Sequence, residues 1–473
     1  MTSETGVPRY MMTSPIYVTP SNPTGLIARR ARDALIQSIR CLGVQCPAGH
    51  LGVECRWWEL DELPRCYKYH LIDCFLHYRF QSGIELHIPR FLASLSLPPD
   101  EGPHPALIDA MCLVACALSR KPYLRKHEPY ILSQARAHLD QSLAEADRLF
   151  DFIRASALLS RYYALRGRFQ EGFITISACA KLTIACGLHK IASRVWSDPR
   201  ARAVPGSSLL KPPRDPVELA ERILGFWAVF VIERMYTIHD RIPSAFVDDE
   251  IETVFPLPLS YFEMEPEMVV GFPEYSLRDI FEPDSGAMCI PNEWPYTRVL
   301  KGMALSQRVA NLRALADVVD FTGSKEFWRN FWAIDRIMQD YIEVIGVLPS
   351  MTVAASGGKP SPSAREINLA FIYVQLHAAV IHLHEPFIAE NDTSHRRCMG
   401  SLEVVVQIAC MIEDVDPRYT YSLYICMRTA YDFLIREMDR RREKGDPVIP
   451  QLEVTRQRLS ATMVRLAPFR IIE

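Results

Sequence analysis

The stretch that decides the fold is ERILGFWAVFVIERMYTIHDRIPSAFVDDEIETVFP, residues 221–256. Its first half carries apolar side chains at helical spacing, which predicts an amphipathic helix with one broad face in a core. That face consists of Ile223, Phe226, Trp227, Phe230, Val231, Met235 and Ile238. The expected charged flank consists of Glu221, Arg222, Glu233 and Arg234. The turn Asp240-Arg241-Ile242-Pro243 ends the helix, and a strand-like acidic segment follows it.

The same spacing of apolar residues recurs on both sides of this helix. Before it, the pattern predicts helices over residues 71–78 and 107–118, two more within 130–165, and one over 169–186. After it, the pattern predicts helices over residues 299–319, 326–345, 365–384, 401–413, 421–442 and 451–466. Strand signals are few. We therefore predict an all-α fold, a large helical bundle or array with long loop insertions.

The loop insertions are expected where Pro, Gly and Ser cluster. These segments are residues 193–216, which we expect to be mobile, 256–295 and 349–362. Residues 86–91 are expected to be an extended piece that leads into the next helix. Glycines punctuate the helices, with Gly167 breaking one and Gly187 standing where a helix C-cap glycine belongs.

Length and composition place the chain among ordinary globular proteins. It has 473 residues, of which 49% are hydrophobic and 23% charged. Residues 1–66 are expected to be a partly disordered N-terminal segment, and residues 67–473 one helical domain. The net charge of -3 gives no overall attraction to nucleic acid. No signal peptide is evident, and the longest apolar run, residues 223–232, is well short of the ~20 residues that span a bilayer. We expect an intracellular protein without a membrane contact.

The thirteen cysteines do not follow the spacing of a structural zinc site, because the chain contains no Cys-x-x-Cys pair. The one alternative cluster is Cys41, Cys46, His50 and Cys55. The pairs Cys112 with Cys116 and Cys179 with Cys186 lie on apolar helices and are expected to be buried small hydrophobes. We therefore predict no metal-binding residue and no cofactor in this chain.

Signals for an enzyme are also missing. The chain has no Gly-x-Gly-x-x-Gly, no Walker-type phosphate loop and no Gly-x-Ser-x-Gly elbow. His377, His382 and His384 lie close together with Glu385, but they lack the His-Glu-x-x-His spacing of a zinc protease. We predict no catalytic residue, and the sequence names no ligand-binding residue.

Two basic clusters remain for other uses. The first, within residues 26–40, consists of Arg29, Arg30, Arg32 and Arg40, which are suited either to phosphate contact or to a solvated helix face. The second consists of Arg440, Arg441, Arg442 and Lys444, which are suited either to nuclear import or to an exposed helix end.

Four short motifs stand out in the order in which they occur along the chain. They are His87-Ile88-Pro89-Arg90-Phe91; Arg166-Gly167-Arg168 with Ala178, Ala180, Ala185 and Gly187-Leu188-His189-Lys190; Phe226-Trp227 with Glu233-Arg234 and Asp240-Arg241-Ile242-Pro243; and Leu383-His384-Glu385-Pro386-Phe387. Together they resemble the middle homology (regulatory) domain of fungal zinc-cluster transcription factors, over residues 67–387. The chain departs from the family pattern at Glu233, Asp240 and Glu385, where Asp, Gly and Arg are usual.

The resemblance implies a helical regulatory domain in the nucleus that modulates transcription and is not an enzyme. Its partners would be the transcriptional machinery or co-regulators, a small-molecule effector and a second copy in a homodimer. The family's zinc cluster, with two Cys-x-x-Cys pairs, is absent from this sequence. DNA would therefore be reached only through a missing zinc-cluster module or a partner protein. The alternative is a helical adaptor with no role at promoters.

Overall fold

A computed structural model describes residues 65–119, 122–201, 209–240, 242–264, 268–282, 285–288, 290, 293–318, 324–359, 362–420, 422–445 and 450–467. The structure is 74% helical, and the described residues contain no strand, so the all-α prediction is confirmed. The cluster around Cys41 to Cys55, the arginines from Arg29 to Arg40, and Arg241 lie outside the described residues.

The chain runs through helices of very different lengths. The N-terminal helices are α2 (Arg65–His77), α3 (Arg79–Ser82), α4 (Ile88–Ser94), α5 (Pro105–Leu118), α6 (Pro122–Arg125), α7 (Glu128–Glu145), α8 (Leu149–Leu165) and α9 (Phe169–Ala185). The middle region contains α10 (Pro216–Asp240), α11 (Leu259–Met264) and the 3-10 turns η2 (Leu188–Lys190), η3 (Pro199–Ala201), η4 (Asp248–Glu250), η5 (Met268–Gly271) and η6 (Asp279–Phe281). The C-terminal helices are α12 (Pro295–Val318), α13 (Lys325–Ile345), α14 (Pro349–Ala355), α15 (Ala364–His384), η8 (Glu385–Phe387), α16 (Asp392–Met411), α17 (Pro417–Thr420), α18 (Leu423–Glu443) and α19 (Pro450–Leu466).

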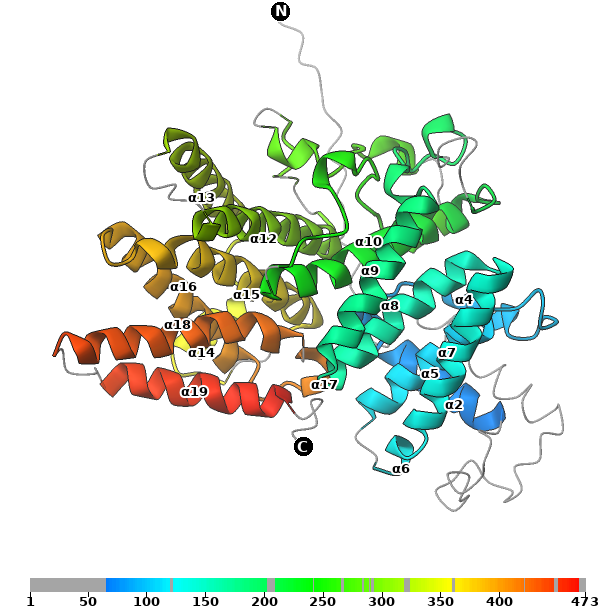
Figure 1. Ribbon diagram of the computed structural model, residues 1–473, viewed down its shortest axis with the longest axis horizontal. Coiled ribbons are helices and arrows are strands. Elements are labelled where there is room, and N and C mark those ends of the chain that lie inside the picture. The colour runs from blue at the N-terminus through cyan, green and yellow to red at the C-terminus, as the bar shows by residue number, and fades with distance from the viewer. Residues whose placement is uncertain are drawn as a thin grey trace, which may run out of the picture.

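These helices form two groups that lie side by side (Figure 1). Helices α2 and α4 to α9 make one group, α12 to α19 make the other, and α10 lies between them. Each group has its own hydrophobic core, which we call the N-terminal core and the C-terminal core. The two cores meet inside α12, where Ala304 belongs to the first and Leu305 to the second. Helix α12 is therefore the continuous element that joins them.

Helix α10 is buried far more completely than one amphipathic face requires. The predicted apolar face is confirmed, with Val231 only partly covered. The prediction of a charged flank is wrong, because Glu233 and Arg234 are 0% and 1% exposed. The reason is tertiary: α8, α9, α11 and α12 all pack against α10, so little of its circumference faces solvent.

Several local predictions need correction. Residues 86–91 are not extended throughout, because α4 begins at Ile88, with Pro89 in its first turn and His87 as its N-cap. The acidic residues 248–250 form a 3-10 turn instead of a strand-like piece. Residues 193–216 are the segment expected to be mobile. At its start Ser193 and Arg194 are buried and both bind Glu274, so the chain is held in place there. The loop insertion expected at residues 349–362 contains the helix α14.

The glycine predictions hold. Gly167 and Gly187 both adopt the left-handed backbone, with φ of +70° and +72°, where a residue with a Cβ would be strained. The turn at Gly187 then places Leu188 inside the N-terminal core. Gly167 therefore ends α8, and Gly187 ends α9 and turns the chain into the N-terminal core.

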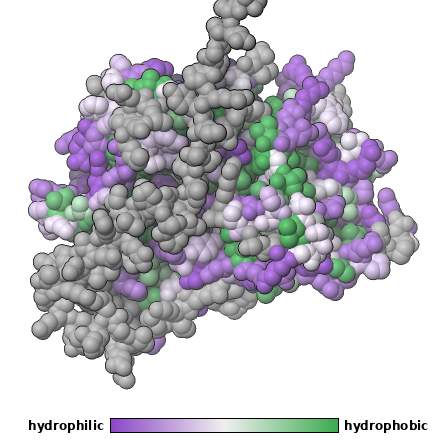
Figure 2. Space-filling model, turned by 180° about the vertical axis from the view of Figure 1, so that it is seen from behind, coloured by the Kyte–Doolittle hydropathy of each residue, from purple (hydrophilic) through white to green (hydrophobic). Residues whose placement is uncertain are grey.

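Among the described residues one helical segment, Glu366–Phe387, is long and apolar enough to cross a membrane. Its most apolar part is 78% buried inside the protein, as expected of the central helix of a packed core. Figure 2 shows the face opposite to that of Figure 1, where hydrophilic residues gather toward the edges and an apolar band lies in the right half.

Candidate functional site

The start of α10 is fixed by its own sequence, Arg214-Asp215-Pro216-Val217-Glu218. Asp215 is the N-cap, since its Oδ1 accepts the N–H of Glu218 (2.9 Å), and Pro216 occupies the first helical position. Asp215 also binds the guanidinium of Arg90 on α4 (3.0 Å). Burial alone would raise the pKa of Asp215, but these hydrogen bonds and the charge of Arg90 lower it. The carboxylate is therefore held ionised.

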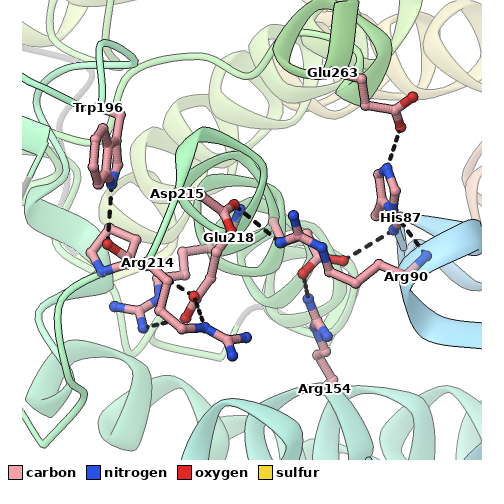
Figure 3. Close-up of polar contacts among 11 residues, drawn as sticks. His87, Arg90, Arg154, Trp196, Arg214, Asp215, Glu218 and Glu263 are labelled. Atoms are coloured by element: carbon pink, nitrogen blue, oxygen red, sulfur yellow. Dashed lines mark hydrogen bonds and ion pairs between the residues drawn. The ribbon is translucent and has the colours of Figure 1, made fainter. Parts of the chain in front are cut away.

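A second carboxylate, Glu221, binds the first family-like motif to α10. Its Oε1 accepts the backbone N–H of His87 (3.0 Å), and its Oε2 lies 3.1 Å from Nη2 of Arg154 on α8. Figure 3 shows His87 turned toward Glu263 on α11, 2.7 Å from its Nε2. Because Nδ1 of His87 accepts the N–H of Arg90, Nε2 carries the proton in that contact. Three helices and the turn before α4 therefore meet at one point.

The connector before α10 is attached through Glu218. This carboxylate accepts the Nε–H of Arg214 (2.8 Å) and an N–H of Arg222 (2.7 Å). Arg222 also donates to the carbonyl of Lys211 (2.5 Å). Trp196 adds a bond from its indole N–H to the carbonyl of Pro213 (3.1 Å), as Figure 3 shows. Each carboxylate in this network faces a guanidinium or an imidazole, so the arrangement is suited to positioning segments.

The middle of α10 holds the turn that follows it. Glu233 accepts the hydroxyl of Ser244 (2.9 Å) and the N–H of Ala245 (2.6 Å). Arg234 binds Asp248 and lies over the ring of Phe230, 4.8 Å from its centre. Burial raises the pKa of Glu233, and the charge of Arg234 opposes that rise. The family-like Glu-Arg pair is thus a buried clamp on residues 244–248.

The segment after this turn pairs with the second motif. The carbonyl of His189 accepts the backbone N–H of Glu252 (2.9 Å), and the carbonyl of Ile191 accepts that of Val254 (3.0 Å). The indole N–H of Trp227 then donates to the carbonyl of Val254 (2.8 Å). Three of the four family-like motifs, far apart in sequence, therefore meet around α10.

The fourth motif lies in the C-terminal core. His384 is buried there, with Nε2 3.1 Å from Asp335 on α13 and Nδ1 3.0 Å from the Ser394 hydroxyl. Burial pushes the pKa of Asp335 upward, but the hydrogen bond and charge of His384, the charge of Arg397 and a hydrogen bond from Gln339 together outweigh it, so the pKa is lowered. Phe387 packs on Trp328 and Phe331, at ring distances of 4.9 Å and 5.4 Å. This motif fastens the end of α15 to α13.

The histidines that the sequence sets close together do not converge. His377 contacts Ser401 on α16, His382 contacts Thr429 on α18, and His384 contacts Asp335 on α13. Glu385 binds Arg436. Within the described residues no group of three His, Cys, Asp or Glu side chains could hold a metal ion.

The cysteine prediction is confirmed, since Cys112, Cys116, Cys179 and Cys186 are all buried. Burial raises the pKa of Cys179 to about 12 and that of Cys186 to about 11, so these thiols stay protonated at neutral pH. They serve as small apolar side chains.

The basic cluster at the end of α18 is largely paired. Arg440 and Arg441 both bind the buried carboxylate of Glu437, and Arg442 binds Asp439. Lys444 is exposed. The arginines therefore stabilise their own helix, and a receptor for nuclear import would compete with these pairs.

A cleft that the sequence did not predict lies where the end of α10 meets α12 and α15. Its empty volume is about 360 Å³, part of which is open to solvent. It is lined by Ile238, Ser306, Val309, Ala310, Arg313, Gln375, Ala378, Ala379 and His382. The sequence signal was the run of small residues Ala378-Ala379 beside polar Gln375 and His382, on an otherwise bulky helix.

No family model, curated protein or solved structure matches this chain. In the part of the chain that the structure describes, the fold is all-α, with two large hydrophobic cores and one small cluster around Val217 and Phe262. Its polar networks join segments that are distant in sequence.

Proposed function

We propose that this chain is the regulatory domain of a fungal zinc-cluster-type transcription factor, which modulates transcription in the nucleus through partner or effector contacts. It would act by contact and conformational change and not by catalysis. DNA would be reached through a zinc-cluster module or a partner protein. A homodimer is one form in which the domain would work.

The observation that carries the proposal is the meeting of three family-like motifs around α10. The turn at His87 is bound to Glu221, the turn at His189 is bound to the segment after α10, and Glu233 with Arg234 holds residues 244–248. Short motifs found by chance in a long chain have no reason to share one helix. Their common use of α10 supports a family origin for the pattern.

The test is a reporter assay with the chain fused to a heterologous DNA-binding domain in a fungal host. We expect the fusion to change transcription from the cognate promoter, and a tagged chain to be found in the nucleus. A matched fusion carrying Glu233→Ala, which removes the clamp after α10, should lose most of that change.

A folded, nuclear fusion that leaves the reporter unchanged under all inducers would count against a transcriptional role. The adaptor hypothesis predicts that result, together with stable capture of partner proteins away from promoters.

A further inference from the structure

Helix α5 begins on a histidine cap. His104 is 3% exposed, and its Nδ1 accepts the backbone N–H of Ala106 (3.2 Å), while Pro105 is the first residue of the helix. Helix caps are usually Ser, Thr, Asp or Asn, whose side-chain oxygens accept hydrogen bonds at neutral and mildly acid pH. A histidine accepts only while its ring is neutral, because an imidazolium carries a proton on both nitrogens. The cap of α5 therefore depends on the protonation of one buried ring.

The same histidine attaches the loop that precedes α5 to the start of α8. The backbone N–H of His104 donates to Oδ2 of Asp151 in the first turn of α8 (2.9 Å). Arg148, the residue before α8, donates to the carbonyl oxygens of Pro99 (2.7 Å) and Gly102 (2.8 Å). These hydrogen bonds hold the loop only while the end of the loop, at His104, stays in place.

The turn between α7 and α8, residues 146–148, has a strained backbone. Ala146 and Arg148 have φ of +51° and +43°, and in the part of the chain that the structure describes they are the only residues other than glycine with positive φ. Residues with a Cβ disfavour this conformation, which persists only where surrounding contacts impose it. The hydrogen bonds from Arg148 to the loop are such contacts, so the turn can relax when the loop leaves.

The charged and titratable groups around His104 set the sign of its response to pH. Burial lowers the pKa of His104 from 6.5, and the positive charges of Arg148 and His138 lower it further. Asp147, whose Oδ2 lies 3.6 Å from Nε2 of His104, and Asp151 oppose this shift without reversing it. The released loop therefore takes up a proton more readily than the attached one. Attachment is fully present above pH 6.5 and weakens as the pH falls.

We propose that His104 is an acid-sensitive latch on the loop between α4 and α5, residues 95–104. Uptake of a solvent proton at Nδ1 removes the acceptor for the N–H of Ala106, uncaps α5 and frees the loop from the turn between α7 and α8. The rest of the N-terminal core stays folded, because α5 itself remains packed on α7 and α8. The latch makes this part of the molecule respond to acidification, and it does not rest on the proposed function.

Amide hydrogen exchange of the purified chain at neutral pH and at about pH 5 tests the latch, with each rate divided by that of an unstructured chain at the same pH. In the wild type we expect protection of the loop and of the first turn of α5 to fall about fivefold on acidification, since a helix cap is worth roughly that factor. His104→Asn keeps a cap that does not titrate, so its protection should not change with pH. His104→Ala has no cap, so protection there should already be low at neutral pH.

The control is His70→Asn on α2, which removes an exposed histidine and should leave the response of the loop as it is in the wild type. Thermal melts should show each variant folded, and exchange in α15 should not respond to the acid step in any of them. The latch is overturned if the wild-type loop keeps its protection at about pH 5, or if His104→Asn loses protection as the wild type does. An equal loss in α15 would also overturn it, because the whole protein and not the loop would then be opening.

Discussion

Glu233 is a carboxylate without exposed surface, and it is tolerated because its oxygens are occupied. The hydroxyl of Ser244 and the N–H of Ala245 bind it, and the guanidinium of Arg234 lies beside it at 3.9 Å. Burying a charge costs free energy that only such partners offset. The pair therefore fixes where the chain turns after α10, and its value lies in positioning more than in net stability.

Replacing Glu233 by alanine should lower the free energy of unfolding by about 2–4 kcal/mol, because two donors and a cation lose their acceptor. Urea unfolding of the purified variant would measure this. The control is Glu343→Ala on α13, an exposed position, where the change should stay within about 0.5 kcal/mol. Equal effects of the two substitutions would contradict the clamp.

His377 gives a pH dependence with a definite sign. Burial lowers the pKa of this imidazole from 6.5 to about 4, while its Nδ1 contacts the Ser401 hydroxyl at 3.1 Å. A lowered folded-state pKa means that the unfolded chain takes up the proton first. The contribution of His377 is fully present above pH 6.5 and is lost as the pH falls toward 4.

We expect the wild-type protein to lose up to about 3 kcal/mol more stability over this acid window than a His377→Asn variant. Urea midpoints of both proteins at several pH values between neutral and acid would show curves that converge as the pH falls. Parallel curves would mean that His377 titrates as a solvent-exposed histidine.

At the scale of elements, helix boundaries follow local sequence, whereas helix packing depends on single close contacts. Gly172 in α9 is such a contact, because a Cβ there would lie 2.1 Å from the hydroxyl oxygen of Tyr236 on α10. That hydroxyl in turn donates to the carbonyl of Ser160 on α8 (2.9 Å). The absence of a side chain at Gly172 therefore lets α8, α9 and α10 share one hydrogen-bonded junction.

Gly172→Ala should destabilise the protein by about 1–3 kcal/mol, because tightly packed cores do not accept an added methyl group without displacement. The matched substitution Gly400→Ala lies on an exposed turn of α16 with open space around it. There alanine should stabilise by about 0.5–1 kcal/mol, through better helix propensity alone. Thermal and urea unfolding of the two variants should move in opposite directions. A shift of the same sign in both would refute this account of the junction.

At the scale of the whole molecule, the two cores are joined by α12 and by Phe371 on α15 and Ile425 on α18, which pack on the N-terminal core. A smaller contact lies between α2–α3 and α17. In that contact His77 Nε2 lies 2.9 Å from the Tyr419 hydroxyl, and the ring centres of Tyr78 and Tyr419 are 5.5 Å apart. The guanidinium of Arg418 lies 5.0 Å from the ring centre of Tyr78. Such a small, partly exposed contact can open without unfolding either core.

Tyr419→Ala should raise amide hydrogen exchange in α3 and α17 by about tenfold, since one hydrogen bond and one aromatic pair are lost. Exchange in α7 and α8 should not change, because neither helix belongs to the contact. The control is Tyr130→Ala on α7, which removes an exposed tyrosine outside this contact and should leave hydrogen exchange in α3 and α17 unchanged. Uniformly faster exchange across both cores would show that the cores do not open separately.

The sequence by itself determined the helical class, most helix positions, the apolar face of α10 and the glycine at the end of α9. These features depend on spacing and backbone preference, which neighbouring residues set. It did not determine that Glu233 and Arg234 would be buried, that His377, His382 and His384 would find separate partners, or that a cleft would form beside Gln375. Those outcomes depend on which helices pack together, and the contacting residues are separated by tens of positions along the chain. Only the tertiary structure decides whether a polar side chain finds water or a buried partner.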